Sequence, residues 1–256
     1  MSETVTLNQP SIKKTHRLPF IDWLRGISIL LMVIYHFCYD LDLFGYIVTT
    51  FGKGPWIPFR YVIVIGFLTL VGVSLVIVHQ RRVNWKSLNK RTLQLLIACI
   101  FVSGSGYFIA ANKITIFGIL QFILVASWLA LPIINKPKLA LIVGIAIFII
   151  GHSVTFPFFN SVWLHWIGMA ETKRAALDFV PLFPWLGAVF VGVFLGHWFM
   201  SEKGRKLGAF TFNNHPNAVL RKINQTIEKM GQNSLVIYLV HQPIMFGVFY
   251  AIEYLH

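Results

Sequence analysis

The sequence is poor in charge, and poorest in acidic residues. Only 12% of its 256 residues are charged, with 9 Asp and Glu against 22 Lys and Arg, whereas 56% are hydrophobic. The mean hydropathy of +0.69 is more apolar than the core of a soluble domain requires. The composition therefore excludes a soluble enzyme and predicts a polytopic membrane protein.

Cysteine is almost absent, since Cys38 and Cys99 are the two in the chain. Both lie in long apolar segments, which excludes a disulfide scaffold. Neither has the spacing of a metal motif, and no zinc, haem or P-loop signature occurs elsewhere. We expect both to be small buried residues, and we expect no metal.

Long apolar runs dominate what is present, and several reach the length of about 20 residues that a membrane span needs. They predict an all-α transmembrane bundle of about seven spans. Residues 1–20 would be a hydrophilic N-terminal arm and residues 21–256 a single membrane domain, with the first span an uncleaved anchor. The predicted spans are residues 21–43, 56–79, 92–110, 114–134, 138–154, 179–200 and 234–254.

The net charge of +13 is distributed as membrane topology would require. Lys and Arg gather in the N-terminal arm and in alternate connections, namely residues 81–91, 136–138 and 203–229. By the positive-inside rule the N-terminus is cytoplasmic, and an odd number of spans puts the C-terminus outside. This distribution favours a membrane protein over a nucleic-acid binder.

The longest segment between spans, residues 201–233, is basic and partly amphipathic. Val219, Leu220, Ile223 and Ile227 would share one face of a helix. Such a helix fits the cytoplasmic leaflet, with its cations on anionic lipid headgroups. A basic rim that attracts a polyanionic ligand is the alternative.

The first span carries a stripe of polar residues. Asp22, Arg25, His36 and Asp40 recur at intervals that place them on one face of a helix. Charged groups within a span are costly and usually face a protein interior or a wet cavity, so the stripe predicts a functional site. In the alternative, Asp22, Arg25 and Asp40 reach the two membrane surfaces and only His36 is buried.

His36 is the side chain best suited to proton transfer near neutral pH. Asp40, one turn later, could accept from one imidazole nitrogen and leave the other as a general base. Arg25, about 16 Å away along the helix, suits a phosphate. A salt bridge from Arg25 to Asp22 is the competing interpretation.

The last span has a second polar face, which includes Tyr238 and His241. Counted from the cytoplasmic ends of the two spans, His241 would lie about 10 Å deep and His36 about 20 Å deep. We therefore expect them not to form one catalytic pair. His241 and Tyr238 would line a channel for a donor substrate or would form hydrogen bonds to a neighbouring helix.

Two further residues are candidates for contact with an acceptor. Gln121 could donate to a developing oxyanion, although an interhelical hydrogen bond is the simpler role. Asp178, which precedes a predicted span, could cap that helix or bind the acceptor.

The segment IDWLRGISILLMVIYHFCYDL resembles the first core helix of bacterial membrane proteins grouped with the catalytic domain of heparan-α-glucosaminide N-acetyltransferase. FGILQF, DFVPLFPWLG and SLVIYLVHQPI resemble later motifs of that group. The spacing from Arg25 to His36 and the run from Tyr238 to Pro243 are also similar to the acyltransferase 3 family.

This resemblance implies transfer of an acyl group, usually acetyl, from cytoplasmic acyl-CoA to a glycan or small-molecule acceptor across a bacterial inner membrane. His36 would be the base and Arg25 part of the donor site. A proton-coupled transporter or flippase, or a non-catalytic membrane subunit, remains the alternative. Sequence alone leaves a homodimer open.

Overall fold

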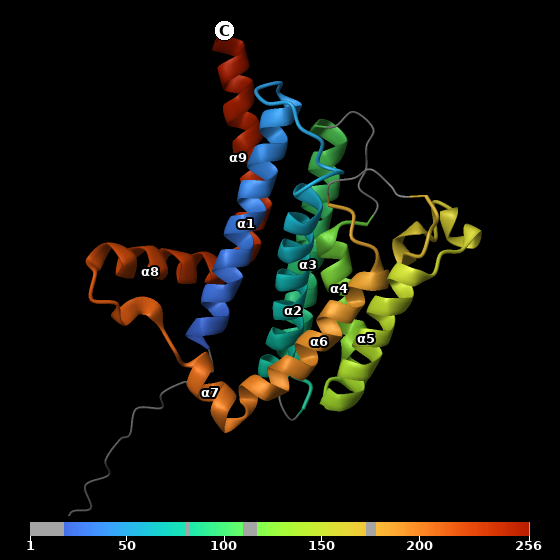
Figure 1. Cartoon of the computed structure of the whole chain (residues 1–256), viewed down its shortest axis with the longest axis vertical. Coiled ribbons are helices and arrows are strands. Elements are labelled where there is room, and N and C mark those ends of the chain that lie inside the picture. The colour runs from blue at the N-terminus through green and yellow to red at the C-terminus, as the bar shows by residue number, and fades with distance from the viewer. Residues whose placement is uncertain (1–17, 80–81, 110–116, 173–177, 256) are drawn as a thin grey trace, which may run out of the picture.

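The computed structural model describes residues 18–79, 82–109, 117–172 and 178–255. These residues form an all-helical bundle, as predicted; they contain no strand, and Gly118 and Phe179 form an isolated β-bridge. Figure 1 shows the arrangement. The α-helices are α1 (Pro19–Leu43), α2 (Trp56–His79), α3 (Trp85–Ile109), α4 (Ile119–Ala130), α5 (Pro137–Ser153), α6 (Leu182–Met200), α7 (Glu202–Gly208), α8 (Ala218–Gln232) and α9 (Ser234–Leu255).

Four of these helices are long and apolar enough to cross a membrane: α1, α2, α6 and α9. They confirm four of the seven predicted spans. The other three are not confirmed: α4 continued by its 3₁₀ turn ends at Ile133 and α5 has 17 residues, both short of a span, and α3 is not among the candidate spans found in the described residues. Residues 110–116, where two predicted spans would meet, lie outside the described part. The chain is nevertheless an integral membrane protein by its apolar helices.

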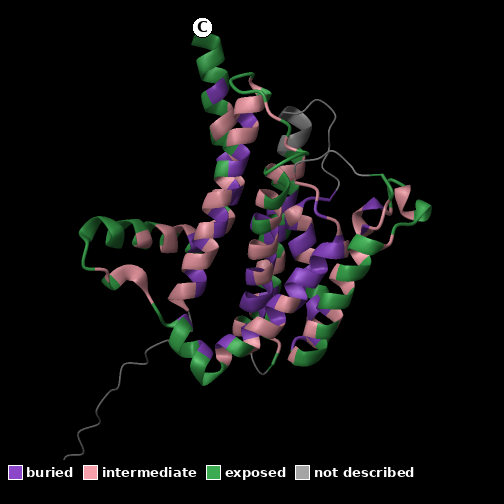
Figure 2. Ribbon diagram, viewed as in Figure 1, coloured by how far each residue is buried: buried purple, intermediate pink, exposed green. Residues whose placement is uncertain are grey.

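Helix α6 forms the centre of the bundle between α2 and α5 (Figure 1). Gly72 on α2 and Gly192 on α6 allow the two backbones to touch, because a Cβ on either glycine would clash with the other helix. Close packing at small residues replaces the hydrophobic effect as a source of helix association in lipid. Buried residues therefore concentrate on α2, α4 and α6 (Figure 2).

Helices α1 and α9 run side by side along one side of the bundle (Figure 1). Near its start α1 is crossed by α8, and Gly26 and Gly231 make this crossing close. A Cβ at Gly231 would clash with the carbonyl of Asp22, and one at Gly26 would clash with the carbonyl of Ile227. The crossing fixes where α9 begins relative to α1.

Helix α8 projects from the bundle at a steep angle to α1 (Figure 1). The side chain of Asn217 caps its first turn by accepting from the backbone N–H groups of Val219 and Leu220. The predicted helix in residues 201–233 is confirmed, and apolar side chains of Val219, Leu220 and Ile223 remain exposed on it.

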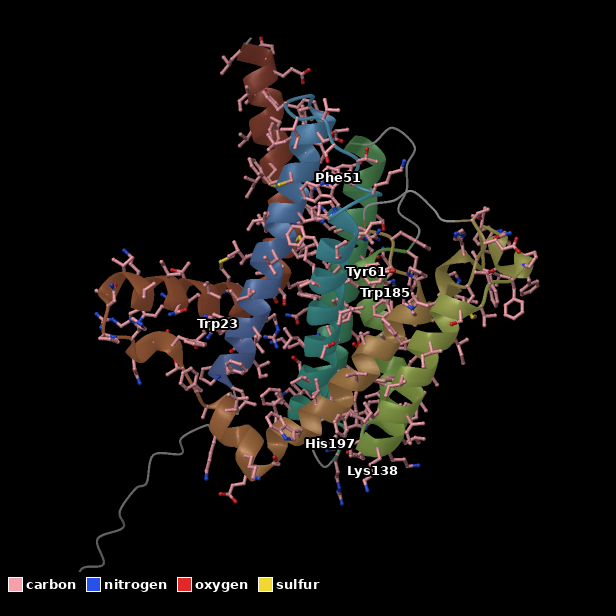
Figure 3. All side chains as sticks on the ribbon, viewed as in Figure 1. Trp23, Phe51, Tyr61, Lys138, Trp185 and His197 are labelled. Carbon is pink, nitrogen blue, oxygen red and sulfur yellow. The ribbon has the colours of Figure 1, made fainter. Side chains whose placement is uncertain are left out.

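The two ends of the bundle differ in chemistry. Lys138, at the start of α5, and His197, near the end of α6, lie at the lower end in Figure 3, which is also the end where α1 begins. The starts of α3 and α5, and α7, all with basic residues, lie at this same end, whereas Phe51 lies toward the opposite end (Figure 3).

Candidate active site

His36 lies in a buried polar cluster that three separate segments build. Its side chain comes from α1 and is 6% exposed overall. The ring Nε2 lies 3.5 Å from Oδ1 of Asp178, which precedes α6. The ring Nδ1 lies 3.0 Å from the side-chain amide of Gln242 on α9. Both ring nitrogens thus face partners from outside α1.

Asp178 reaches His36 because its neighbourhood is anchored at several points. Arg60 on α2 donates to the carbonyl of Phe179 at 2.9 Å, and Phe179 also pairs with Gly118 in the isolated bridge. The hydroxyl of Tyr238 on α9 donates to Oδ2 of Asp178 at 3.2 Å. Asp178 is therefore held against His36, and it does not cap α6, whose N-cap is Pro181 and which has no side-chain cap hydrogen bond.

His241 belongs to the same cluster, so the prediction that it lies at a different depth from His36 is wrong. The two rings meet edge to face with centroids 5.0 Å apart. The depth estimate failed because it counted from the start of each span, whereas Gly231 packs against Asp22 and Gly26, so α9 starts about two turns further in than α1 does. The Nδ1 of His241 pairs with the carbonyl of Tyr238 at 2.7 Å.

Asp40 does not hold the ring of His36 directly, and this prediction is also wrong. The residue is fully buried, yet neither of its carboxylate oxygens makes a hydrogen bond. Its neighbour is the side chain of Gln242. The spacing within α1 predicted Asp40 as the partner of His36. In the structure Gln242 on α9 faces Nδ1 of the ring, and Asp178 before α6 faces Nε2.

A second polar cluster lies near the start of α1. Arg25 makes a salt bridge to Asp22 at 2.8 Å, so the competing interpretation of this pair is realised. The guanidinium also donates to the hydroxyl of Ser74 on α2 at 2.7 Å and to the carbonyl of Gly231 at 3.5 Å. Arg25 thereby ties α1 to α2 and to the end of α8.

This second cluster carries excess positive charge. Arg91 on α3 lies within electrostatic range of both Arg25 and His79. Asp22 pairs with Arg25, and its Oδ2 has no hydrogen-bond partner, so the cluster holds two guanidinium groups and one carboxylate. A pair of guanidinium groups with one carboxylate can accommodate an anion such as phosphate.

Gln121 stands apart from the His36 cluster. Its carbonyl accepts from the backbone N–H of Gly118 at 3.0 Å, and its amide nitrogen donates to Ser103 at 3.2 Å. It thus closes the first turn of α4 and supports Gly118, which pairs with the residue after Asp178. No group of three His, Cys, Asp or Glu residues in the described part is placed to hold a metal.

Sequence reasoning missed Gln242, Ser74 and Arg60. Gln242 had a usable signal, because an amide within an apolar span needs a buried partner. Ser74 had none, since serine commonly bonds to its own helix, as Ser74 also does to Leu70 at 2.6 Å. Arg60 gave no signal either, because a cation near the end of a span usually lies at the membrane surface.

The geometry suits proton transfer at His36 and anion binding at Arg25 and Arg91. The two clusters share α1, and about 16 Å of helix separates Arg25 from His36. Cations at one end and a buried imidazole further along could together hold and activate a long anionic substrate.

Comparison with protein families gave a match over most of the chain. The family described as "Heparan-alpha-glucosaminide N-acetyltransferase, catalytic" matches residues 17–243, which includes both clusters. Comparisons with curated proteins and with solved structures gave no significant match.

Proposed function

The chain belongs to the heparan-α-glucosaminide N-acetyltransferase catalytic family, and we propose that it transfers an acyl group, acetyl in the first instance, from cytoplasmic acyl-CoA to an acceptor at the outer face. The acceptor carries a hydroxyl or an amine, as a sugar does. The observation that supports this most strongly is the buried His36, which faces Asp178 on one side and Gln242 on the other.

His36 acts as the general base in this proposal. Its Nε2 takes the proton from the acceptor O–H or N–H while the acceptor atom attacks the thioester carbonyl. The new acyl–oxygen or acyl–nitrogen bond forms as the carbon–sulfur bond breaks, and His36 returns the proton to the departing thiolate. Base catalysis of this kind contributes roughly 10²–10⁴-fold in rate.

Asp178 and Tyr238 orient this step. Oδ1 of Asp178 is 3.5 Å from Nε2 of His36, longer than a typical direct hydrogen bond, so an acceptor group that lies beside the pair could contact both residues. The Tyr238 hydroxyl fixes the other oxygen of Asp178. A developing imidazolium at His36 would be stabilised by this nearby carboxylate.

Arg25 and Arg91 would bind the phosphate groups of the donor. Their excess positive charge over Asp22 supports an anion at this end of α1. The separation of about 16 Å from His36 matches the reach of an extended chain of about five residues, comparable with a pantetheine arm. The arm would carry the thioester from this end of α1 to His36.

The orientation in the membrane follows from charge. The basic segments gather at the end of the bundle where α1 begins, which by the positive-inside rule is cytoplasmic. The donor cluster would then open to the cytoplasm, with the His36 cluster closer to the outer face. A bacterial inner membrane is the location that this proposal adopts.

A proton-coupled transporter is the second candidate, and the contact between His36 and His241 is the observation that favours it. Two adjoining imidazoles and Asp178 could pass a proton through the bundle. Such a protein would move a substrate in response to a pH gradient and would release no thiol from acetyl-CoA.

The test uses the purified full-length chain in detergent and in proteoliposomes. Calorimetry with coenzyme A measures donor binding, and thiol release from acetyl-CoA with a panel of amino sugars and hydroxylated sugars measures transfer. We expect binding in both wild type and His36→Ala, but transfer in the wild type alone. Control variant His215→Ala changes an imidazole in the connection between α7 and α8 and should retain both.

Absence of coenzyme A binding would overturn the proposed donor. Uptake of a substrate driven by a pH gradient, without thiol release, would establish the transporter instead. If His36→Ala retains full transfer, His36 is not the base.

A further inference from the structure

Asp40 and Gln242 carry buried oxygens that have no hydrogen-bond partner. Both oxygens of Asp40 and the Oε1 of Gln242 are buried without a hydrogen bond, and the two side chains are neighbours. Three unpaired acceptors in one buried place are unfavourable, because each loses its hydration without gaining a donor. Something must supply a donor to them.

The amide of Gln242 can supply it. Its nitrogen now faces Nδ1 of His36 at 3.0 Å, and its oxygen faces no donor. The two ends of the amide are nearly equal in size, so a half-turn of the terminal group exchanges them. The amide nitrogen would then donate to Asp40, and the carbonyl would accept from Nδ1–H of His36.

We propose that Gln242 is a positioning residue that links Asp40 to His36 and holds the proton of the imidazole on Nδ1. Nε2 is then left with its lone pair toward Asp178 and the acceptor. The purpose of this tautomer rests on the proposed function. The tautomer itself is a property of His36 in the protein without substrate. It gives Asp40 a role at His36 although neither oxygen of Asp40 makes a hydrogen bond to the ring.

The two sides of the ring favour opposite tautomers. The carboxylate of Asp178 by itself favours a proton on Nε2, whereas the unpaired oxygens of Asp40 and Gln242 favour a proton on Nδ1. An imidazole with its proton on Nε2 would donate toward Asp178 and have no lone pair available there for an acceptor proton. With the proton on Nδ1, every polar atom of Gln242 has a partner and one oxygen of Asp40 gains a donor. Fully paired groups are the normal state of buried polar networks.

The test reads the tautomer directly. Selective ¹⁵N labelling of histidine gives different nitrogen shifts for the Nδ1–H and Nε2–H forms, and loss of a signal in His36→Asn assigns the residue. We expect the Nδ1–H form in the wild type. Gln242→Met and Asp40→Leu should each shift the population toward Nε2–H, whereas Gln242→Glu, whose carboxylate still accepts from Nδ1, should retain Nδ1–H.

Helical content by circular dichroism and retained coenzyme A binding would verify that each variant is folded. Gln94→Met changes an exposed glutamine on α3 and serves as the matched control, with no change in the His36 signal. In the transfer assay Gln242→Met should lower kcat about 10²–10⁴-fold with little change in KM for the donor, and Gln242→Glu should recover part of that loss.

A wild-type His36 protonated on Nε2, or a tautomer unchanged in Gln242→Met, would overturn the proposal. The NMR measurement needs no substrate, so it separates the two claims. If the expected tautomer is found but no acyl transfer, the role of Gln242 is supported and the enzymatic function is refuted. If acyl transfer is found but Gln242→Met does not change the tautomer, the enzymatic function is supported and the role of Gln242 is refuted.

Discussion

Nε2 of His36 on α1 lies 3.5 Å from Oδ1 of Asp178, the residue that leads into α6. This pair adds a contact between α1, which packs with α8, α2 and α9, and the entry to α6, which packs with α2 and α5. A group that approaches this pair meets an imidazole and a carboxylate together. The pair is therefore the first place to test.

Replacement of Asp178 by Asn should lower kcat for acyl transfer by about 10–100-fold, since a half-buried carboxylate that stabilises an imidazolium contributes on the scale of a charged hydrogen bond. Donor affinity, measured by calorimetry, should be unchanged because Asp178 is far along the bundle from Arg25. Asp42→Asn is the matched control, as Asp42 accepts from the backbone of Thr49 outside the cluster. Equal losses in both variants would refute a specific role.

Replacement of Gly231 by Ala should lower the thermal stability of the protein. The added Cβ would clash with the carbonyl of Asp22, and overpacking of this kind typically costs about 1–3 kcal/mol. Donor binding should weaken as well, because the Gly231 carbonyl is a partner of Arg25. Gly247→Ala, where a Cβ meets no atom within 4 Å, should keep the wild-type melting temperature.

Arg91→Gln should weaken coenzyme A binding by about tenfold and flatten its dependence on ionic strength, because one of two guanidinium charges is lost. Isothermal titration at two salt concentrations measures both effects. The adjacent Lys90 is exposed, so Lys90→Gln serves as control and should behave as the wild type. A similar loss in both variants would indicate nonspecific attraction.

The apolar face of α8 should lie in the lipid of the cytoplasmic leaflet. In vesicles, an environment-sensitive fluorophore on Ile223→Cys should emit at shorter wavelength than the same label on Lys222→Cys, which is exposed on the same helix. Brominated lipids should quench the first label more strongly. Equal emission at both positions would mean that α8 stands clear of the membrane.

The orientation can be tested by labelling single cysteines in a variant without Cys38 and Cys99. Lys138→Cys should react with an impermeant maleimide in inside-out vesicles, and Phe158→Cys, at a side chain that is 71% exposed, should react in right-side-out vesicles. The opposite result would invert the topology and place the donor cluster on the wrong side.

Several sequence signals predicted features that the structure or the family comparison bears out. Long apolar runs predicted the four helices that can span a membrane, and the amphipathic pattern of residues 201–233 predicted α8. Polar residues within spans identified His36, Arg25, Tyr238 and His241, because a buried polar group in lipid is costly wherever the helix packs. The motifs along the chain also identified the family.

Contacts between side chains of different helices were less predictable from the sequence. Asp40 was paired with His36 because the sequence reveals neighbours on one helix, whereas Gln242 and Asp178 come from elsewhere. The depth of His241 was misjudged because Gly231 and Gly26 set the start of α9, and the clash a Cβ would make there is visible only in the packed backbone.

The sequence by itself determined that this chain is a helical membrane protein with titratable groups inside its spans, since hydropathy and residue spacing act along the chain. Only the tertiary structure decided which of those groups meet. Contacts between α1, α9 and the entry to α6 depend on backbone approach and helix offset, which no periodicity encodes. The grouping of His36 with Asp178, His241 and Gln242 is a consequence of that packing.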